Sequence, residues 1–221
     1  GIDLMGYTAR NRMNIFSHRV APIQINFLGL EATTGSEQID YLIADEITIP
    51  KEYANFYSEE ILYMPNCYMP FNNRISISEK TFNRSLFNLP EQSFVLAAFH
   101  ASYKITPREI SSWSRILKEV PNAVLWITEP KEKSKHNLLL LFNDNGIASD
   151  RIYFARRMKS REEHLARHSC ADLFLDTFNF NAHSTALDSL WCELPVITLI
   201  GKSFIARVSA SLLTNLGLIE L

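Results

Sequence analysis

Short apolar runs alternate with amphipathic stretches over the later part of the chain. Five of these runs have the length of strands and lie at residues 95–99, 123–127, 151–154, 172–175 and 195–199. Most are apolar at consecutive positions rather than at every second one, which is typical of strands covered by helices on both faces of a parallel sheet. The pattern therefore predicts a doubly wound α/β domain with right-handed crossovers over roughly residues 91–216.

Two of the expected helices have clear starting signals. Thr106 is followed at once by Pro107 and three residues later by Glu109, and Ser160 precedes Glu163 by the same spacing. This is the spacing of the capping box, in which two side chains satisfy amide groups at the helix start. After Thr106, one helical stripe contains Ile110, Trp113, Ile116, Leu117 and Val120. Such a stripe predicts a helix that packs on the sheet rather than a functional site.

The first part of the chain is less regular. Three apolar runs have the length of strands there and lie at residues 23–28, 41–44 and 61–64. Residues 75–85 are polar and lack a helical period, which favours a connection between two lobes. We therefore place a boundary near Lys80, with one domain over residues 1–80 and a second over residues 81–221.

Composition excludes few classes of protein but lowers the expectation of a polyanionic partner. The chain has 221 residues, 47% of them hydrophobic, enough for one large or two modest domains with buried cores. Its 22 basic and 24 acidic residues are scattered along the sequence. We therefore expect no nucleic-acid partner.

The cysteines and the apolar runs bear on the compartment. Cys67, Cys170 and Cys192 are odd in number, and their spacing fits neither a disulfide framework nor a zinc site. The longest apolar runs are far shorter than the roughly 20 residues of a membrane span. We therefore expect a cytoplasmic protein without a membrane partner. The chain starts without methionine and stops inside an apolar pattern, so we also expect a fragment.

Polar and cationic residues follow several of the predicted strands. In open parallel sheets, ligands bind beyond the carboxyl ends of the strands. Residues 100–104 follow the first strand of the second domain, residues 155–159 the third, and residues 176–183 the fourth. The ligand site is therefore expected where these three loops meet.

The fourth loop carries the most information because it runs directly into an apolar helix at Ser184 and Thr185. A helix start offers free amide groups and a partial positive charge, so hydroxyl groups there can complete a diphosphate site. Asp188, one turn further on, can accept hydrogen bonds from a ribose diol. Alternatively, Ser184 only caps the helix and His183 only packs, and spacing does not separate the two interpretations.

Three further side chains are candidates for ligand contacts. Lys104 lies at the ligand edge of the sheet, where an ammonium group can stabilise a departing diphosphate, although a lone loop lysine is usually solvated. His164 and Arg167 share one face near the start of the helix that follows Ser160. Their ring and guanidinium can flank a base, but taken alone the two residues are better explained as exposed decoration of a helix.

Several of these residues lie within longer blocks that occur in the same order in a known family. The blocks are residues 19–24, 40–45, 103–105, 163–167 and 181–191. From residue 6 to residue 221, the chain resembles the catalytic region of O-linked N-acetylglucosamine transferases and their SPINDLY-like relatives. Agreement of several collinear blocks makes a chance match very improbable.

The resemblance implies a GT-B fold, with two Rossmann-like lobes of parallel strands and the sugar nucleotide in the cleft. Both lobes would be incomplete here, with residues 1–80 as the C-terminal part of the first lobe and residues 81–221 as a truncated nucleotide-binding lobe. The family works without a metal, so no cofactor is expected. A tetratricopeptide array that recruits protein acceptors often precedes such a catalytic region.

The resemblance also implies roles at the phosphates. Lys104 would neutralise the diphosphate leaving group, and the adjacent Tyr103 would contact the nucleotide. The run His183, Ser184 and Thr185 would bind the phosphates. This agrees with the strand-end argument above.

The nucleoside would contact a second group of residues. By the same resemblance, Asp188 would hold the ribose, and Arg161 stands where relatives carry a lysine near the ribose. His164 would stack on uracil. Arg167 and the backbone at Lys159 would address the base edge.

The chain departs from the family pattern at several positions. Ala101 replaces an asparagine or glutamine that approaches the nucleotide in relatives, and His100 stands beside it. In the loop over residues 29–35, Glu31 and Ala32 stand where proline and glycine are usual. The histidines proposed to act near the acceptor would precede Gly1, so the fragment alone is not expected to be fully active.

The sequence therefore predicts an inverting glycosyltransferase region that moves N-acetylglucosamine from its UDP donor to serine or threonine hydroxyls of proteins. A GDP-fucose-dependent protein O-fucosyltransferase is one alternative, as in plant SPINDLY relatives. A degenerate relative that binds a nucleotide or a protein without transferring sugar is another, and Ala101 and the altered loop favour it.

Overall fold

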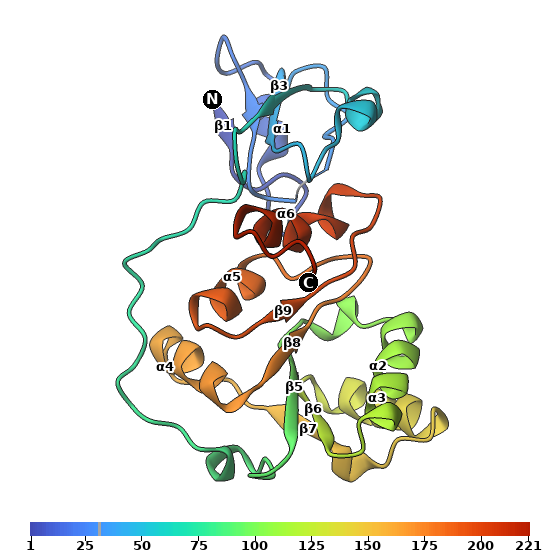
Figure 1. Ribbon diagram of the computed structural model, residues 1–221. Coiled ribbons are helices and arrows are strands. Elements are labelled where there is room, and N and C mark those ends of the chain that lie inside the picture. Colours follow the sequence, from blue (N-terminus) through green and yellow to red (C-terminus); the bar gives the residue numbers. More distant parts are fainter. Residues whose placement is uncertain (31) are drawn as a thin grey trace. The chain divides into compact units, whose positions relative to one another are not determined.

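The chain forms two compact units in the computed structural model, which describes residues 1–30 and 32–221 (Figure 1). The first unit combines Gly1–Phe71 with Ile200–Leu221, and the second is Asn72–Leu199. This division differs from a single boundary near Lys80, because the chain returns to the first unit for its last segment.

The second unit contains one sheet of five parallel strands in the order β7-β6-β5-β8-β9. The strands are β5 (Phe94–Ala98), β6 (Ala123–Thr128), β7 (Ile152–Ala155), β8 (Leu173–Leu175) and β9 (Val196–Ile197). Each lies in one of the five predicted apolar runs, apart from shifts of one residue at the ends of some strands. The predicted α/β class with parallel strands is confirmed.

Helices and 3-10 turns, the latter labelled η, precede the first of these strands or connect one strand to the next. They are η2 (Arg84–Phe87), η3 (Ser102–Lys104), α2 (Pro107–Glu119), α3 (Glu132–Asp144), η4 (Ser149–Arg151), α4 (Arg161–Ala166), η5 (Arg167–Cys170) and α5 (Ser184–Trp191). The capping box at Thr106 and Glu109 is present, and the Ser160 hydroxyl accepts a hydrogen bond from the Glu163 amide at 3.2 Å. Both predicted helix starts are therefore confirmed.

The two faces of this sheet carry different helices. Figure 1 shows α2 and α3 on one side of the sheet and α4 and α5 on the other. Ile110, Trp113 and Leu117 of α2 are buried in one apolar cluster with Leu138 and Phe142 of α3. The predicted stripe thus faces the core, as burial of apolar surface favours. Its last residue is the exception, because Val120 follows the helix end and is 42% exposed.

The first unit has a smaller sheet of four parallel strands in the order β1-β2-β3-β4. Its elements are β1 (Ile2–Asp3), α1 (Met13–Phe16), β2 (Ile25–Asn26), β3 (Tyr41–Ala44), η1 (Lys51–Phe56), β4 (Glu60–Tyr63), η6 (Phe204–Ala206) and α6 (Val208–Asn215). The three predicted runs contain β2, β3 and most of β4. Strand β1 was not predicted, since two residues are too few to show a period.

The loop after β2 contains one of the departures noted in the sequence. A side chain at Gly29 would place its Cβ only 2.0 Å from the carbonyl carbon of Met5, so this close approach requires glycine. The carbonyl of Ala32 accepts a hydrogen bond from the Asn26 amide side chain at 3.2 Å. Glu31 lies outside the described residues.

Helix length and the state of the cysteine side chains relate to expectations drawn from the sequence. The longest helices, α2 and α3, have 13 residues each. Within residues 1–30 and 32–221, no helix has the length and apolar character needed to cross a bilayer. Cys67, Cys170 and Cys192 are free thiols.

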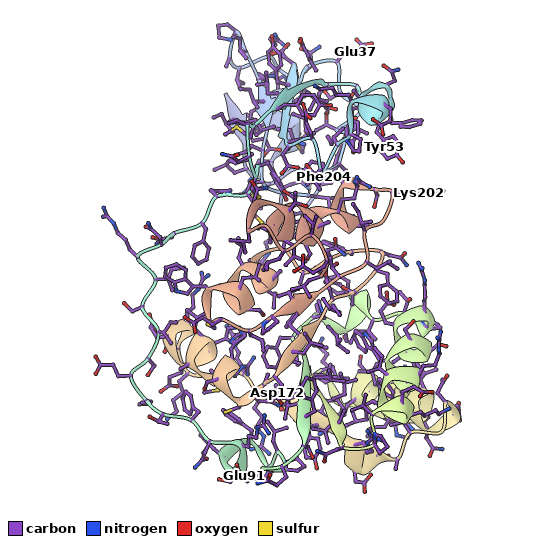
Figure 2. The ribbon with its side chains drawn as sticks, in the orientation of Figure 1. Glu37, Tyr53, Glu91, Asp172, Lys202 and Phe204 are labelled. Atoms are coloured by element: carbon purple, nitrogen blue, oxygen red, sulfur yellow. The ribbon has the colours of Figure 1, made fainter. Side chains whose placement is uncertain are left out.

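The C-terminal segment belongs to the first unit because it completes that unit's core. Phe204, labelled in Figure 2, and Val208 are buried in one cluster with Leu42 and Ile49. The ring of Phe204 meets that of Tyr68 edge-on, with centroids 4.9 Å apart. The sequence pattern assigned residues 200–216 to the second α/β domain, and this assignment is wrong because the segment packs in the first unit.

Asp45 fixes this segment to the rest of the first unit. Its Oδ1 accepts hydrogen bonds from the amides of Ile47 at 3.0 Å and Thr48 at 2.7 Å. Its Oδ2 accepts from the amide of Tyr68 at 2.9 Å and from the hydroxyl of Ser211 at 2.6 Å. One buried carboxylate therefore joins three distant parts of the sequence.

We predict that Asp45→Ala lowers the free energy of unfolding by about 1–3 kcal/mol, because buried donors lose their acceptor. Urea denaturation followed by circular dichroism measures the change. The matched control is Glu46→Ala, since Glu46 is exposed and pairs with exposed Lys51 at 2.7 Å. That substitution should change the free energy by less than about 1 kcal/mol. Equal losses in the two variants would contradict the assigned role of Asp45.

Candidate functional site

A pocket of about 620 Å³ opens at the carboxyl ends of β5, β6 and β7, within the second unit. It is lined by Phe99, Thr128, Glu129, Ala155, Arg156, Arg157, Met158, Lys159, Ser160, Arg161, His164, Arg167, Ser184 and Asp188. Its size is within the range of about 300–1,000 Å³ that small-molecule sites occupy. The pocket lies at the strand ends, where the parallel-sheet rule places a ligand.

Six of the predicted site residues meet in this pocket. They are Lys159, Arg161, His164, Arg167, Ser184 and Asp188. Five of the lining side chains are cations, at positions 156, 157, 159, 161 and 167, whereas the lining carboxylates are at positions 129 and 188. This excess of positive charge favours an anionic ligand.

Arg161 and Asp188 form an ion pair across the pocket wall. Arg161 opens α4 and Asp188 lies in α5, and the distance from guanidinium Nη2 to carboxylate Oδ1 is 2.8 Å. Burial raises the pKa of the Asp188 carboxyl, and Arg161 opposes this shift. The two side chains predicted to lie near a ribose are thus adjacent, with the carboxylate mostly buried and the guanidinium half-exposed.

Arg167 is a buried cation stacked on aromatic rings. Only 3% of its surface is exposed, and its guanidinium lies 4.4 Å from the ring centroid of Phe99 and 5.8 Å from that of Trp126. Its Nη1 donates to the carbonyl of Arg156 at 2.7 Å, whereas its Nε has no hydrogen-bond partner among the described residues. Burial lowers its pKa to about 10, so it remains charged at neutral pH.

His164 lies beside this cation with its imidazole neutral. Burial, and then the positive charge of Arg167, lowers the pKa of His164 to about 3. Its ring centroid is 5.0 Å from that of His168, whose pKa burial lowers to about 4. A neutral ring against a pocket wall suits stacking on a base. His164 is half-buried and Arg167 buried, so the alternative of exposed helix decoration is wrong.

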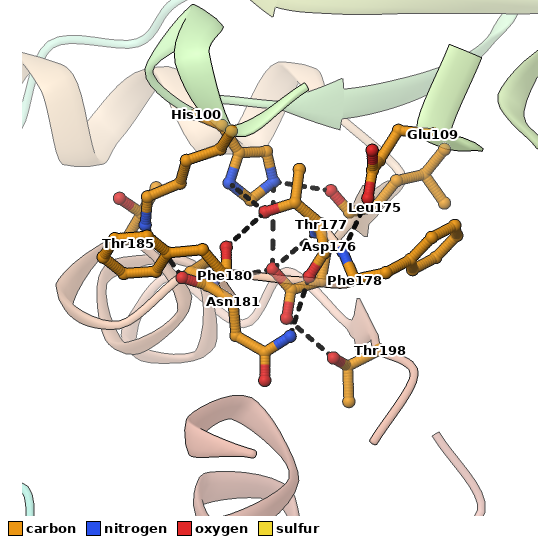
Figure 3. Close-up of polar contacts among 12 residues, drawn as sticks. His100, Glu109, Leu175, Asp176, Thr177, Phe178, Phe180, Asn181, Thr185 and Thr198 are labelled. Atoms are coloured by element: carbon orange, nitrogen blue, oxygen red, sulfur yellow. Dashed lines mark hydrogen bonds and ion pairs between the residues drawn. The ribbon is translucent and has the colours of Figure 1, made fainter. Parts of the chain in front are cut away.

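The loop after β8 folds around the buried carboxylate of Asp176 (Figure 3). Its Oδ1 accepts from the amides of Thr177 at 2.7 Å and Ala182 at 2.6 Å, and its Oδ2 accepts from the hydroxyl of Thr198 at 2.7 Å. The Asn181 side-chain amide donates to the carbonyl of Thr177 at 2.7 Å. The carboxylate thus holds both ends of the loop.

Glu109 supports the same loop from α2. Its Oε2 accepts from the amide of Thr106 at 2.7 Å, and its Oε1 accepts from the amide of Phe178 at 2.9 Å. The residue is fully buried. Sequence reasoning identified only the capping role of Glu109, because the second bond spans 69 positions and no local signal marks it.

Lys104 lies against this loop and outside the residues that line the pocket. Its Nζ donates to the carbonyl of Asn181 at 2.8 Å and stands 3.7 Å from the ring centroid of Phe180. Tyr103 and His183 flank the same ring, with centroids 6.5 Å and 5.0 Å from it. Three of the predicted residues, Lys104, Tyr103 and His183, therefore lie around the ring of Phe180. The sequence pattern did not identify Phe180 itself as a site residue.

The start of α5 adds Ser184 and Thr185. His183 is the residue before the helix and makes no side-chain capping bond, so Ser184 is the first helical residue rather than the cap. The alternative in which Ser184 only caps the helix is therefore wrong. Ser184 is exposed and lines the pocket, whereas the next residue, Thr185, is half-buried and does not line it.

His100 does not take the place of the asparagine or glutamine side chain that relatives carry where this chain has Ala101. Its imidazole is buried and its Nε2 donates to the carbonyl of Leu175 at 2.9 Å, inside the sheet edge. Burial lowers its pKa. In the part of the chain that the structure describes, no group of three or more His, Cys, Asp or Glu side chains is placed to hold a metal ion.

Comparison with known proteins gives one family. The model of Glycosyl transferase family 41 matches residues 1–78 and 72–221. Relatives include "Probable UDP-N-acetylglucosamine--peptide N-acetylglucosaminyltransferase SEC" of Arabidopsis thaliana, 36% identical over 98% of this chain and 23% of the relative. The protein of the same description named SPINDLY, also from Arabidopsis thaliana, is 29% identical over 98% of this chain and 24% of its own length.

A solved structure matches the whole chain. It is a mutant of the Thermobaculum terrenum O-GlcNAc transferase, 26% identical, with a TM-score of 0.88 over 100% of this chain and 41% of that one. The chain thus spans about a quarter of the curated relatives named above and less than half of this solved structure.

We predict that the stability of the protein falls as the pH drops from about 6.5 toward 4. The pKa values of His164 and His168 are about 3 and 4 when folded, so protons bind these rings in the unfolded chain first. Uptake of protons by the unfolded state lowers the free energy of unfolding in this window, and the contribution is fully present above it.

Urea denaturation at a series of pH values measures this slope. His168→Gln should make it shallower between pH 6.5 and 4, whereas His136→Gln, at an exposed position on α3, should leave it unchanged. A slope that His168→Gln does not alter would exclude a neutral buried His168.

Proposed function

Since the chain belongs to glycosyl transferase family 41, we propose that it is the donor-binding region of an inverting glycosyltransferase that transfers N-acetylglucosamine from UDP-N-acetylglucosamine to serine or threonine hydroxyls of proteins. The observation that carries this proposal is the cationic pocket at the strand ends, which holds six residues of the predicted nucleotide site. The two Arabidopsis thaliana relatives are described as probable UDP-N-acetylglucosamine–peptide N-acetylglucosaminyltransferases, and this description supports the donor and the acceptor class.

The nucleoside would lie between α4 and α5. Neutral His164 offers its ring face to uracil, and the cation of Arg167, whose Nε is unpartnered, would address the base edge together with the backbone of Lys159. Asp188 would accept the ribose hydroxyls while its bond to Arg161 holds it ionised and oriented. Every one of these residues lines the same pocket.

The diphosphate would bind at the start of α5. Free amide groups at a helix start and the hydroxyls of Ser184 and Thr185 suit phosphate oxygens. The loop that leads to them is fixed through Asp176 and Glu109, so these groups would need little rearrangement when the donor binds.

Leaving-group stabilisation would be the chemical task of Lys104. An acceptor oxygen attacks the anomeric carbon from the face opposite the diphosphate, the bond from that carbon to the phosphate oxygen breaks, and UDP departs with the electron pair. Charge grows on the diphosphate as the bond breaks, and an ammonium group already in place lowers the barrier. The Nζ of Lys104 donates to the carbonyl of Asn181, and Asn181 lies two residues before His183 in the sequence.

The remaining expectations stay part of the proposal. The reaction would need no metal ion, with the ammonium group, the helix start and the pocket cations balancing the diphosphate. The protein would act in the cytoplasm on protein acceptors, with a tetratricopeptide array preceding the catalytic region. The base that accepts the hydroxyl proton would lie in sequence before Gly1.

A thermal-shift screen tests the nucleotide. We predict that UDP raises the melting temperature of the full-length protein more than GDP does, since a ligand that binds only the folded state stabilises it. Asp188→Asn should reduce the UDP shift, whereas Asp150→Asn, at an exposed position that does not line the pocket, should not. A preference for GDP would favour the fucose donor, and UDP stabilisation without transfer would favour a degenerate relative.

Lys104→Met tests the leaving-group role in the full-length protein. We predict a fall in turnover of about 100-fold to 1,000-fold, the size expected for loss of one preorganised charge, with less than a tenfold change in UDP affinity. Initial rates with UDP-N-acetylglucosamine and calorimetric titration of UDP measure the two effects. Lys133→Met, at an exposed position of α3, is the matched control. Comparable turnover in the mutant and the parent would remove Lys104 from the mechanism.

A further inference from the structure

The ammonium group of Lys104 is held by two neighbouring residues of the loop after β8. The face of the Phe180 ring lies 3.7 Å from Nζ, measured to the ring centroid, and the carbonyl of Asn181 accepts from Nζ at 2.8 Å. Both the ring face and the carbonyl oxygen present negative potential to the cation. A lysine side chain has several freely rotating bonds, so contacts of this kind select one of many positions.

The ring of Phe180 is itself held in place. The Thr177 hydroxyl donates to the Phe180 carbonyl at 2.6 Å, and the amide of Ala182 donates to the buried carboxylate of Asp176 at 2.6 Å. The backbone is therefore fixed at the carbonyl of Phe180 and again at the amide of Ala182, two residues later. The rings of Tyr103 and His183 flank the Phe180 ring, which limits its rotation further.

We propose that Phe180 is a positioning residue whose ring face holds the Lys104 ammonium group at the start of α5, where the departing diphosphate of the sugar donor develops charge. The inference rests on the proposed function, and it adds a residue that does not line the nucleotide pocket. A charge that is already in place stabilises the transition state without reorganisation, so loss of the ring affects the rate and leaves nucleotide binding intact.

The same loop offers a matched control. Phe178 carries a second ring under a cation, with the guanidinium carbon of Arg108 5.0 Å from its centroid. It lies in the same loop, is half-buried like Phe180, and has a cation other than Lys104 on its face. Phe178→Leu thus removes an equal amount of ring from the loop and leaves the Lys104 contact in place.

The decisive experiment measures initial rates and UDP affinity in the full-length protein. Phe180→Leu should lower kcat between about twofold and thirtyfold, the range for loss of one cation–π contact, and change the Kd of UDP less than twofold. Phe180→Tyr, which keeps the ring face, should retain at least half of the parent kcat, as should Phe178→Leu. In a Lys104→Met background, Phe180→Leu should have no further effect on kcat.

Three results would overturn the inference while leaving the proposed function standing. They are a kcat of Phe180→Leu equal to that of the parent, an equal loss in Phe178→Leu, and a full effect of Phe180→Leu in the Lys104→Met background. Failure of the parent protein to bind UDP or to transfer N-acetylglucosamine is a different outcome. It would overturn the proposed function, and this inference with it.

A spectroscopic readout tests the contact without any assay of activity. The ε-methylene protons of Lys104, assigned by comparison with the Lys104→Met variant, should show an upfield ring-current shift in the parent protein. The shift should disappear in Phe180→Leu and persist in Phe178→Leu. An unshifted signal in the folded parent would show that the ring does not hold the ammonium group, and would overturn the inference directly.

Discussion

The carboxylate of Asp176 is the interaction on which the candidate site depends. A loop that turns at the end of a buried strand exposes several backbone amides to an apolar interior, and each needs an acceptor. Asp176 supplies one for Thr177 and one for Ala182, and it reaches Thr198 after the next strand. The course of the chain into α5, and hence the places of Ser184 and Asp188, follows from this single buried charge.

Two further side chains, buried Arg167 and half-buried His164, determine the chemistry of one wall of the pocket. Arg167 keeps its charge despite burial because aromatic faces and a carbonyl replace water around it. That charge in turn helps to keep His164 neutral. One wall of the pocket therefore presents a cation and an uncharged aromatic ring side by side, a combination that suits a base with polar edges and a flat face.

The sequence predicted the parts of this arrangement that depend on local pattern. Consecutive apolar residues identified all five strands of the second unit, and spacing identified the helix starts at Thr106 and Ser160. Strand-end positions led to Lys104, His164 and Ser184. Long-range contacts could not be predicted, because neither the bond from Glu109 to Phe178 nor the ring of Phe180 under Lys104 has a periodic signal. The return of the C-terminal segment to the first unit was missed for the same reason.

The path of the chain through the two units has a consequence for synthesis on the ribosome. Residues 1–71 emerge before the second unit, but Phe204, Val208 and Ser211, which pack with them, emerge only after the whole of the second unit. The second unit has its own apolar cluster and can close as soon as its last strand is available. Vectorial synthesis therefore favours folding of the later-encoded unit before the earlier one, the reverse of the usual order from the N-terminus.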